Sequence, residues 1–170
     1  MTLPNEKFRE VLFVLLYSRE LSTESDEELV SLVSKELKVA STHVRTALER
    51  VRKILDRKEE IDEKLRTLST EYTFERIQVV EKCILRLDAY EILFDDSIPA
   101  KVSIAEGLRL SKKFSTSSSV SFVNALLDAL WKNEAGEPIE KEALKQSIEE
   151  MTEVEQLTEQ YIREQQEDSE

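Results

Sequence analysis

The side chains that most often carry catalysis or hold metals are scarce in this chain of 170 residues. The one histidine, His43, lies at a candidate helix start, with no cysteine or second histidine at ligand spacing. The one cysteine, Cys83, sits on an apolar face, as a buried structural thiol does. Two isolated glycines, Gly107 and Gly136, cannot form a phosphate-binding loop. We therefore expect no enzyme, no metal site and no cofactor.

The acidic charge of the chain is concentrated at its C-terminal end. Of the formal net charge of −12, residues 134–170 contribute −10, with 13 acidic and 3 basic side chains. Subtracted from the totals of 36 acidic and 24 basic residues, this leaves 23 and 21 in residues 1–133, a net of −2. A nearly neutral domain can present a basic face, although it lacks the basic composition of proteins that bind nucleic acid alone.

The composition favours an all-α protein. The chain has only 2 glycines and 3 prolines, and 35% of its residues are charged. Its length suits one domain with a hydrophobic core. No apolar stretch approaches the length that spans a membrane, and the N-terminus has no signal-peptide pattern. We expect a cytoplasmic protein that does not contact the membrane.

Apolar spacing predicts three helices in the first part of the chain. The first covers residues 4–21, and Ser22 or Thr23 caps the second, which begins near Asp26. Ser41 or Thr42 caps the third, longer helix, whose apolar residues are Val44, Leu48, Val51 and Leu55 and which reaches at most to Leu65.

Three more helical patterns fill residues 79–131. They are separated by Ser97-Ile98-Pro99 and by the serine cluster 115–119. Beyond Gly136 and Pro138 an amphipathic helix is expected, with these apolar residues spaced by three or four: Leu144, Ile148, Met151, Val154, Leu157 and Tyr161.

This spacing divides the chain into a helical domain, residues 1–134, and an acidic extension, residues 135–170, part helical and part disordered. The extension either docks on the helical domain, where its glutamates compete for basic side chains, or remains a solvated, solubilising segment.

Two stretches resemble the NusB transcription antitermination-factor family. VEKCILRLDAYEI, IPAKVSIAEG and FVNALLD, in residues 80–128, resemble the family patterns V-E-x-x-I-L-R-x-x-x-Y-E-L, I-P-x-x-V-x-I-N-E-A and F-V-N-G-V-L-D. FREVLFVLLYSRELS, residues 8–22, resembles its first helix. The resemblance implies an all-α fold of two packed sub-bundles, here with an extra acidic C-terminal helix.

The resemblance also implies a function. Family members pair with a small-subunit ribosomal protein, the factor NusE, and the pair binds boxA-type single-stranded RNA in the RNA polymerase antitermination complex. The alternative is a protein-binding helical module, monomeric or homodimeric, that has lost RNA recognition. Tyr17 and Glu81 match positions associated with the protein partner. Tyr17 can equally cap the core, and Glu81 is expected on the surface, opposite the apolar line of its helix.

Seven residues are candidates for RNA contact. Phe122 matches a motif phenylalanine that would stack on an unpaired base, and a core phenylalanine is the equal alternative. Asn124 would bind the RNA backbone or make a structural hydrogen bond. The other candidates are basic: Lys7, Arg9, Lys101, Lys112 and Lys113. A single lysine such as each of the last three more often serves solubility than phosphate contact.

Several positions depart from the family patterns. The arginine-rich N-terminal arm is replaced by MTLPNEKFRE, and the basic residue before Phe122 is Ser121. Gly107 replaces the alanine that usually follows the I-N-E segment. The apolar positions of the family patterns are retained in this chain, whereas the basic residues expected to face RNA are fewer. The resemblance therefore supports the fold most strongly and RNA binding least.

Overall fold

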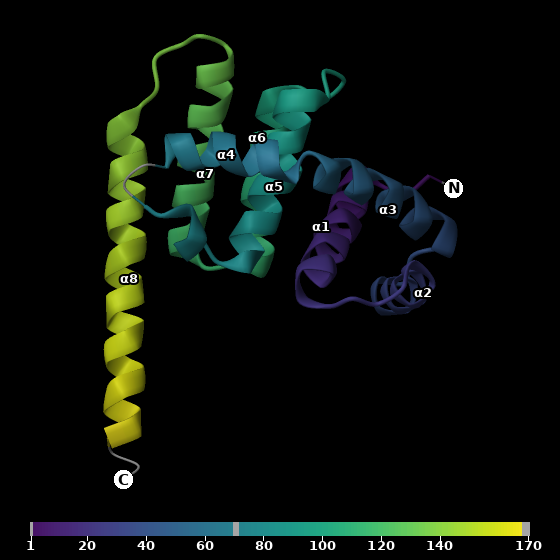
Figure 1. The fold of residues 1–170 in the computed structure, drawn as a ribbon, viewed down its shortest axis with the longest axis horizontal. Coiled ribbons are helices and arrows are strands. Elements are labelled where there is room, and N and C mark those ends of the chain that lie inside the picture. The colour runs from purple at the N-terminus through teal and green to yellow at the C-terminus, as the bar shows by residue number, and fades with distance from the viewer. Residues whose placement is uncertain (1, 70–71, 168–170) are drawn as a thin grey trace.

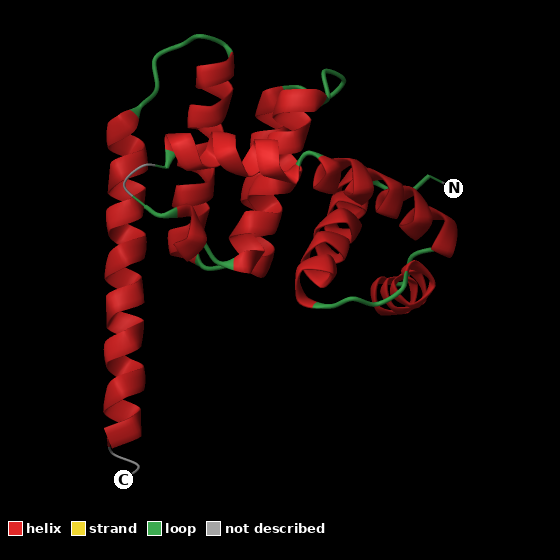
Figure 2. Ribbon diagram, in the orientation of Figure 1, coloured by secondary structure: helices red, strands yellow, loops and turns green. Residues whose placement is uncertain are grey.

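The protein is all-helical in the part of the chain that this computed structural model describes, residues 2–69 and 72–167 (Figures 1 and 2). These ranges contain eight α-helices and a 3-10 turn, Phe74–Arg76, and no strand. The expected all-α class is confirmed. The helices are α1 (Asn5–Leu21), α2 (Asp26–Leu37), α3 (Ser41–Asp56), α4 (Lys58–Leu68), α5 (Val79–Phe94), α6 (Ala100–Phe114), α7 (Ser117–Glu134) and α8 (Lys141–Glu167).

The helices form two packed sub-bundles. In one, α1, α2 and α3 contact one another, and the other contains α4 to α8 (Figure 1). Helix α5 joins the two, since it packs against α1 and α3 as well as α4, α6 and α7. Its residues 83–91 are all buried, as expected for a helix enclosed on every side.

The third expected helix does not reach Leu65, because the chain turns between α3 and α4. Arg57 leaves helical geometry, with φ −103° and ψ 5°, and its guanidinium lies 4.8 Å from the centre of the Phe94 ring. Helix α3 packs on α1 and α2, whereas α4 packs on α5 and α7. The break at Arg57 lets one continuous apolar pattern serve both sub-bundles.

The cap of α2 also differs from the expected one. Ser25, rather than Ser22 or Thr23, accepts a hydrogen bond from the Glu28 backbone N–H, and the Glu28 carboxylate accepts one from the Ser25 N–H, both at 3.3 Å. This reciprocal capping box fixes the start of α2.

A buried ion pair ties α5 to its neighbours. Arg86 donates to both carboxylate oxygens of Asp62 on α4, at 2.8 and 2.9 Å, and to Glu20 on α1 at 3.0 Å. Arg86 is 5% exposed. Its planar donor set therefore holds three helices together, a role that lysine could not reproduce.

Gly107 makes room for a buried carboxyl group. Asp88 on α5 is fully buried, and neither of its side-chain oxygens has a hydrogen-bond partner. A Cβ at Gly107 would lie 2.2 Å from Asp88 Oδ2 and 3.0 Å from a Leu127 methyl carbon. Burial, and then the nearby Glu91 charge, raises the pKa of Asp88 well above its ordinary value. The glycine at this motif position is therefore required by the aspartate opposite it.

Cys83 is the buried thiol that the sequence predicts. It is 0% exposed, and burial raises its pKa to about 12, so the thiolate does not form at neutral pH.

Helix α8 is docked along only part of its length. Leu144, Ile148 and Met151 are buried in the common core, and α8 packs on α7. Its second half extends past the end of the bundle (Figure 1). The helix continues to Glu167, and the last part of the expected disordered segment, 168–170, lies outside the described residues.

Candidate functional site

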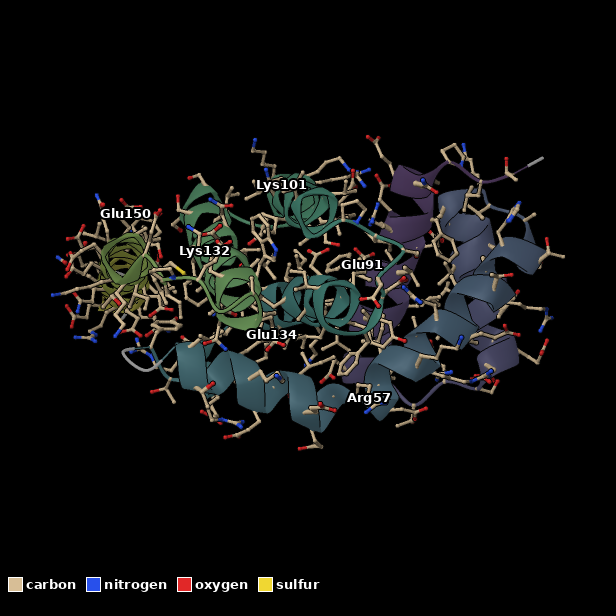
Figure 3. The ribbon with its side chains drawn as sticks, turned by 90° about the horizontal axis from the view of Figure 1, so that it is seen from above. Arg57, Glu91, Lys101, Lys132, Glu134 and Glu150 are labelled. Atoms are coloured by element: carbon tan, nitrogen blue, oxygen red, sulfur yellow. The ribbon has the colours of Figure 1, made fainter. Side chains whose placement is uncertain are left out.

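Arg9 is buried inside the protein, where it pairs with a carboxylate of α5. It is 7% exposed, and its Nε and Nη2 donate to the two carboxylate oxygens of Glu91 at 3.2 and 3.1 Å. Ser103 on α6 donates to the same carboxylate at 2.6 Å. In the view along α8, Glu91 lies inside the molecule, whereas Lys101 and Glu150 lie at its outer edge (Figure 3). The expectation of RNA contact by Arg9 is corrected, because its donors already bind Glu91 on α5.

Phe122 is a core residue. It is 0% exposed, and its ring meets that of Tyr72 edge to face, with the centroids 5.5 Å apart. Tyr72 is 1% exposed and donates to Glu155 on α8, so α8 lies over this aromatic pair. Since no face of Phe122 is open to a base, the stacking role expected from the motif is wrong and the core alternative holds.

Three cations surround one carboxylate between α1 and α6. Lys113 and Arg109 lie 3.0 Å from Glu10, and Lys7 lies 3.7 Å from it. Burial raises the pKa of Glu10, but hydrogen bonds from Lys113 and Arg109 outweigh it, so the pKa is lowered overall. Glu10 and Glu106, which binds Arg109 at 2.9 Å, offset much of this positive charge. Lys7 and Lys113 therefore remain candidates for RNA contact, but Glu10 neutralises part of the positive charge that they would offer to phosphate. No sequence signal indicated Arg109.

The other candidates for RNA contact lie on the outer faces of α6 and α7. Lys101 and Lys112 are exposed, eleven residues apart, at the two ends of α6. Lys101 lies 5.9 Å from the centre of the Trp131 ring, which shows that the start of α6 meets the end of α7. Asn124 is exposed on α7. Lys112 forms no ion pair with a described residue, so it is free to bind phosphate.

The two residues assigned to the protein partner are joined by one series of contacts, which passes through the buried Phe13. Tyr17 is half-buried and stacks on Phe13, with centroids 6.1 Å apart, and Phe13 stacks on Phe114 at 4.6 Å. The next residue, Ser115, donates a hydrogen bond to Glu81. Neither Phe13 nor Phe114 was assigned to this series, because residues a hundred positions apart carry no shared periodicity.

Glu81 is more buried than expected. It is 3% exposed rather than on the surface, and its second oxygen, Oε2, has no hydrogen-bond partner. The carboxylate lines a groove of about 730 Å³ between the start of α5, the α6–α7 connection and α8. Its Oε2 is therefore a buried acceptor without a partner in a residue that lines this groove, and a hydrogen-bond donor reaching it would offset the cost of its burial.

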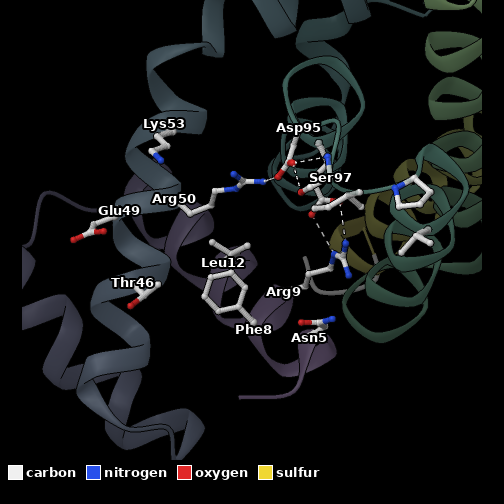
Figure 4. A pocket seen from close by; sticks show the side chains of 14 residues that line it. Asn5, Phe8, Arg9, Leu12, Thr46, Glu49, Arg50, Lys53, Asp95 and Ser97 are labelled. Atoms are coloured by element: carbon white, nitrogen blue, oxygen red, sulfur yellow. Dashed lines mark hydrogen bonds and ion pairs between the residues drawn. The ribbon is translucent and has the colours of Figure 1, made fainter. Parts of the chain in front are cut away.

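A second cleft, of about 510 Å³, lies between α1, α3 and the α5–α6 connection (Figure 4). Arg9 is held by Glu91, and Arg50 by Asp95, which also accepts a hydrogen bond from the Ser97 backbone. Lys53 and Glu49 complete the ionisable lining, giving three cations and three carboxylates. The cleft has no net charge to attract phosphate.

Comparison with known proteins shows the family of this chain. A family model described as the NusB family matches residues 6–132. The chain belongs to the NusB family. The NusB transcription antitermination protein of Clostridium perfringens (strain SM101 / Type A) is 34% identical over 129 residues, 75% of this chain and 96% of that protein. The NusB transcription antitermination protein of Chlamydia pneumoniae is 31% identical over 128 residues, 75% of this chain and 80% of that protein.

Solved NusB structures have the same fold. T. maritima NusB superposes with a TM-score of 0.66 and 28% identity, covering 85% of this chain and 99% of that one. A chain of the crystal structure of antitermination factors NusB and NusE in complex with dsRNA superposes with a TM-score of 0.65 and 26% identity, covering 75% and 96%.

The NusB match covers nearly all of α1 to α7 and ends before α8. Tyr17, Glu81, Phe114 and Ser115 therefore lie within the matched residues, whereas the α8 wall of the groove lies outside them. Among the described residues no helix is long and apolar enough to cross a membrane, and no group of three or more histidine, cysteine or acidic residues is placed to hold a metal.

Proposed function

We propose that this NusB-family protein is a non-enzymatic transcription antitermination factor in the cytoplasm. It pairs with a NusE-type ribosomal protein, and the pair binds boxA-like single-stranded RNA as part of the RNA polymerase antitermination complex. The family match over residues 6–132 supports this proposal, as does the solved complex of a related NusB with NusE and dsRNA.

The observation that carries the protein-partner assignment is the series of contacts from Tyr17 to Glu81. A stacked aromatic series and the Ser115–Glu81 hydrogen bond join α1, the end of α6 and the start of α5. The half-buried Tyr17 and Phe114, packed on the buried Phe13 and near an acceptor without a partner, suit a protein interface with a desolvated centre.

RNA binding is proposed for the heterodimer and not for the free chain. Of the seven candidates, Arg9 and Phe122 are buried, and Lys7 and Lys113 share Glu10. Lys101, Lys112 and Asn124 remain as the exposed set. With so few exposed cations, the free chain would neutralise few phosphates and bind RNA weakly. Its log–log salt slope would also be shallow, since each phosphate neutralised on a single strand contributes about −0.7 to that slope.

The test is a titration of the full chain with its NusE-type partner, then of the pair with a boxA-like RNA and a scrambled RNA. Glu81→Gln keeps the size of the buried side chain and removes its charge, and Tyr17→Ala removes the ring at the other end of the series. Both are expected to weaken partner binding about tenfold, equivalent to 1.4 kcal/mol. Arg45→Ala, an exposed change on α3, is the control and should bind as the wild type does.

Absence of partner binding by the wild-type chain would contradict the proposal. Partner binding without any preference of the pair for boxA-like RNA would instead support a protein-binding module that has lost RNA recognition.

A further inference from the structure

Helix α8 carries an apolar surface that nothing in the described chain covers. Among the described residues seven large hydrophobic side chains are exposed, and four of them lie within one stretch of nine residues in α8: Val154 (44% exposed), Leu157 (66%), Tyr161 (63%) and Ile162 (50%). At about 100° per residue they fall within an arc of about 140°, which overlaps the face that buries Met151. This α8 ridge, residues 152–167, continues the packing face of the helix beyond the bundle.

The α8 ridge borders the groove that Glu81 lines. Met151, Val154 and Glu155 form the α8 wall of this groove, opposite the α6–α7 connection. Glu155 fixes the wall in place, because it accepts hydrogen bonds from Tyr72 and, at 2.7 Å, from Arg76. The partnerless Oε2 of Glu81, on a side chain that is 3% exposed, marks the groove as a place for a donor group.

The charge of the α8 ridge selects the kind of occupant. Residues 152–167 contain five glutamates and one arginine, a net charge of −4. A second copy of this chain would bring an equal negative charge against it, and repulsion between like charges opposes that contact. RNA is disfavoured for the same reason.

We propose that the groove and the α8 ridge receive a basic, partly apolar segment of the NusE-type protein partner, so that α8 extends the partner-binding surface beyond the NusB-matched residues. This inference rests on the proposed function. Apolar side chains of the segment pack on Val154 and Tyr161, a lysine or arginine meets Glu159, and a donor reaches Glu81. Two glutamates at this end of the chain pair with residues other than the RNA candidates: Glu155 of α8 with Arg76, and Glu140, just before α8, with Lys132.

The test compares variants of the full chain in titrations with the NusE-type partner at low and high salt. Glu159→Lys reverses a charge on the groove wall, and Glu149→Lys makes the same change on the outward face of the docked half. Val154→Ser/Tyr161→Ser removes the apolar ridge, and Leu32→Ser, at an α2 residue that is 45% exposed, is its control. Thermal unfolding of each variant confirms that the fold is retained.

We expect Glu159→Lys to weaken the partner about tenfold at low salt and less at high salt, because salt screens exposed charges. The Val154→Ser/Tyr161→Ser variant should lose about tenfold or more at both salt concentrations, since it removes packing and not charge. Both controls should bind as the wild type does.

Unchanged affinity of all α8 variants, with Glu81→Gln still weakened, would overturn this inference and leave the proposed function standing. Tighter binding of the partner by the α8 variants would also overturn it, and would show that α8 restrains partner binding. Self-association of the wild type that is lost in Val154→Ser/Tyr161→Ser would show that the occupant is a second copy. No partner binding by the wild type would contradict both proposals.

Discussion

Arg9 and Glu91, 82 residues apart in the chain, bind each other through two hydrogen bonds inside the protein. This contact joins α1 to α5 and therefore one sub-bundle to the other. Arg9→Ala would leave a buried carboxylate without its cation, which costs about 3–5 kcal/mol. We expect a loss of that size in the free energy of unfolding measured in urea. Lys7→Ala, a half-exposed neighbour, should change it by less than about 0.5 kcal/mol. Full stability of Arg9→Ala together with lost RNA affinity would restore Arg9 as an RNA contact.

Asp88 makes the stability of the protein depend on pH. An unfolded aspartate ionises near pH 3.9, whereas burial raises the pKa of Asp88 in the folded protein. A carboxyl group whose pKa is higher in the folded state contributes less stability as the pH rises from the unfolded toward the folded pKa. Asp88→Asn cannot ionise, so its stability relative to the wild type should increase from acid to neutral pH. Urea unfolding at a series of pH values measures this, and a difference that does not vary with pH would contradict it.

Gly107 and Asp88 should be energetically coupled. Gly107→Ala places a methyl group against the Asp88 carboxyl and a Leu127 methyl, and overpacking of this kind costs about 1–3 kcal/mol. In an Asp88→Ala background much of that cost should disappear, because the contact at 2.2 Å is removed. Additive effects in a double-mutant cycle would show that the two sites are independent.

Phe122 should affect stability rather than RNA contact. Phe122→Ala removes a fully buried ring and is expected to cost about 3–5 kcal/mol. Phe122→Leu keeps most of the volume, so the variant should remain folded and the heterodimer should bind RNA as the wild type does. A folded Phe122→Leu protein with strongly weakened RNA binding would contradict the core assignment.

The apolar spacing predicted where helices lie but not what each face meets. Leu144, Ile148 and Met151 are buried as their spacing indicates, yet Tyr161 continues the pattern and is 63% exposed, because the bundle ends before it. The 3.6-residue period shows which side of a helix faces inward, and only the neighbouring helix decides whether that side is covered.

Roles carried over from motif positions failed for a related reason. The family patterns located Phe122 and Arg9 correctly on their helices, but burial and the Arg9–Glu91 contact depend on distant segments. The same holds for the turn at Arg57, which arises because α3 and α4 must pack on different neighbours.

The partial docking of α8 has a thermodynamic consequence. Past Met151, its last buried residue, the helix continues for about 24 Å, at 1.5 Å per residue. A helical segment of this length is only marginally stable in water when tertiary packing does not support it. Amide hydrogen exchange should therefore be slow near Leu144 and become progressively faster toward Glu167. Any protein that binds this end must supply the free energy that orders it, so its affinity would rise when helix-favouring substitutions on the solvent face reduce that entropic cost.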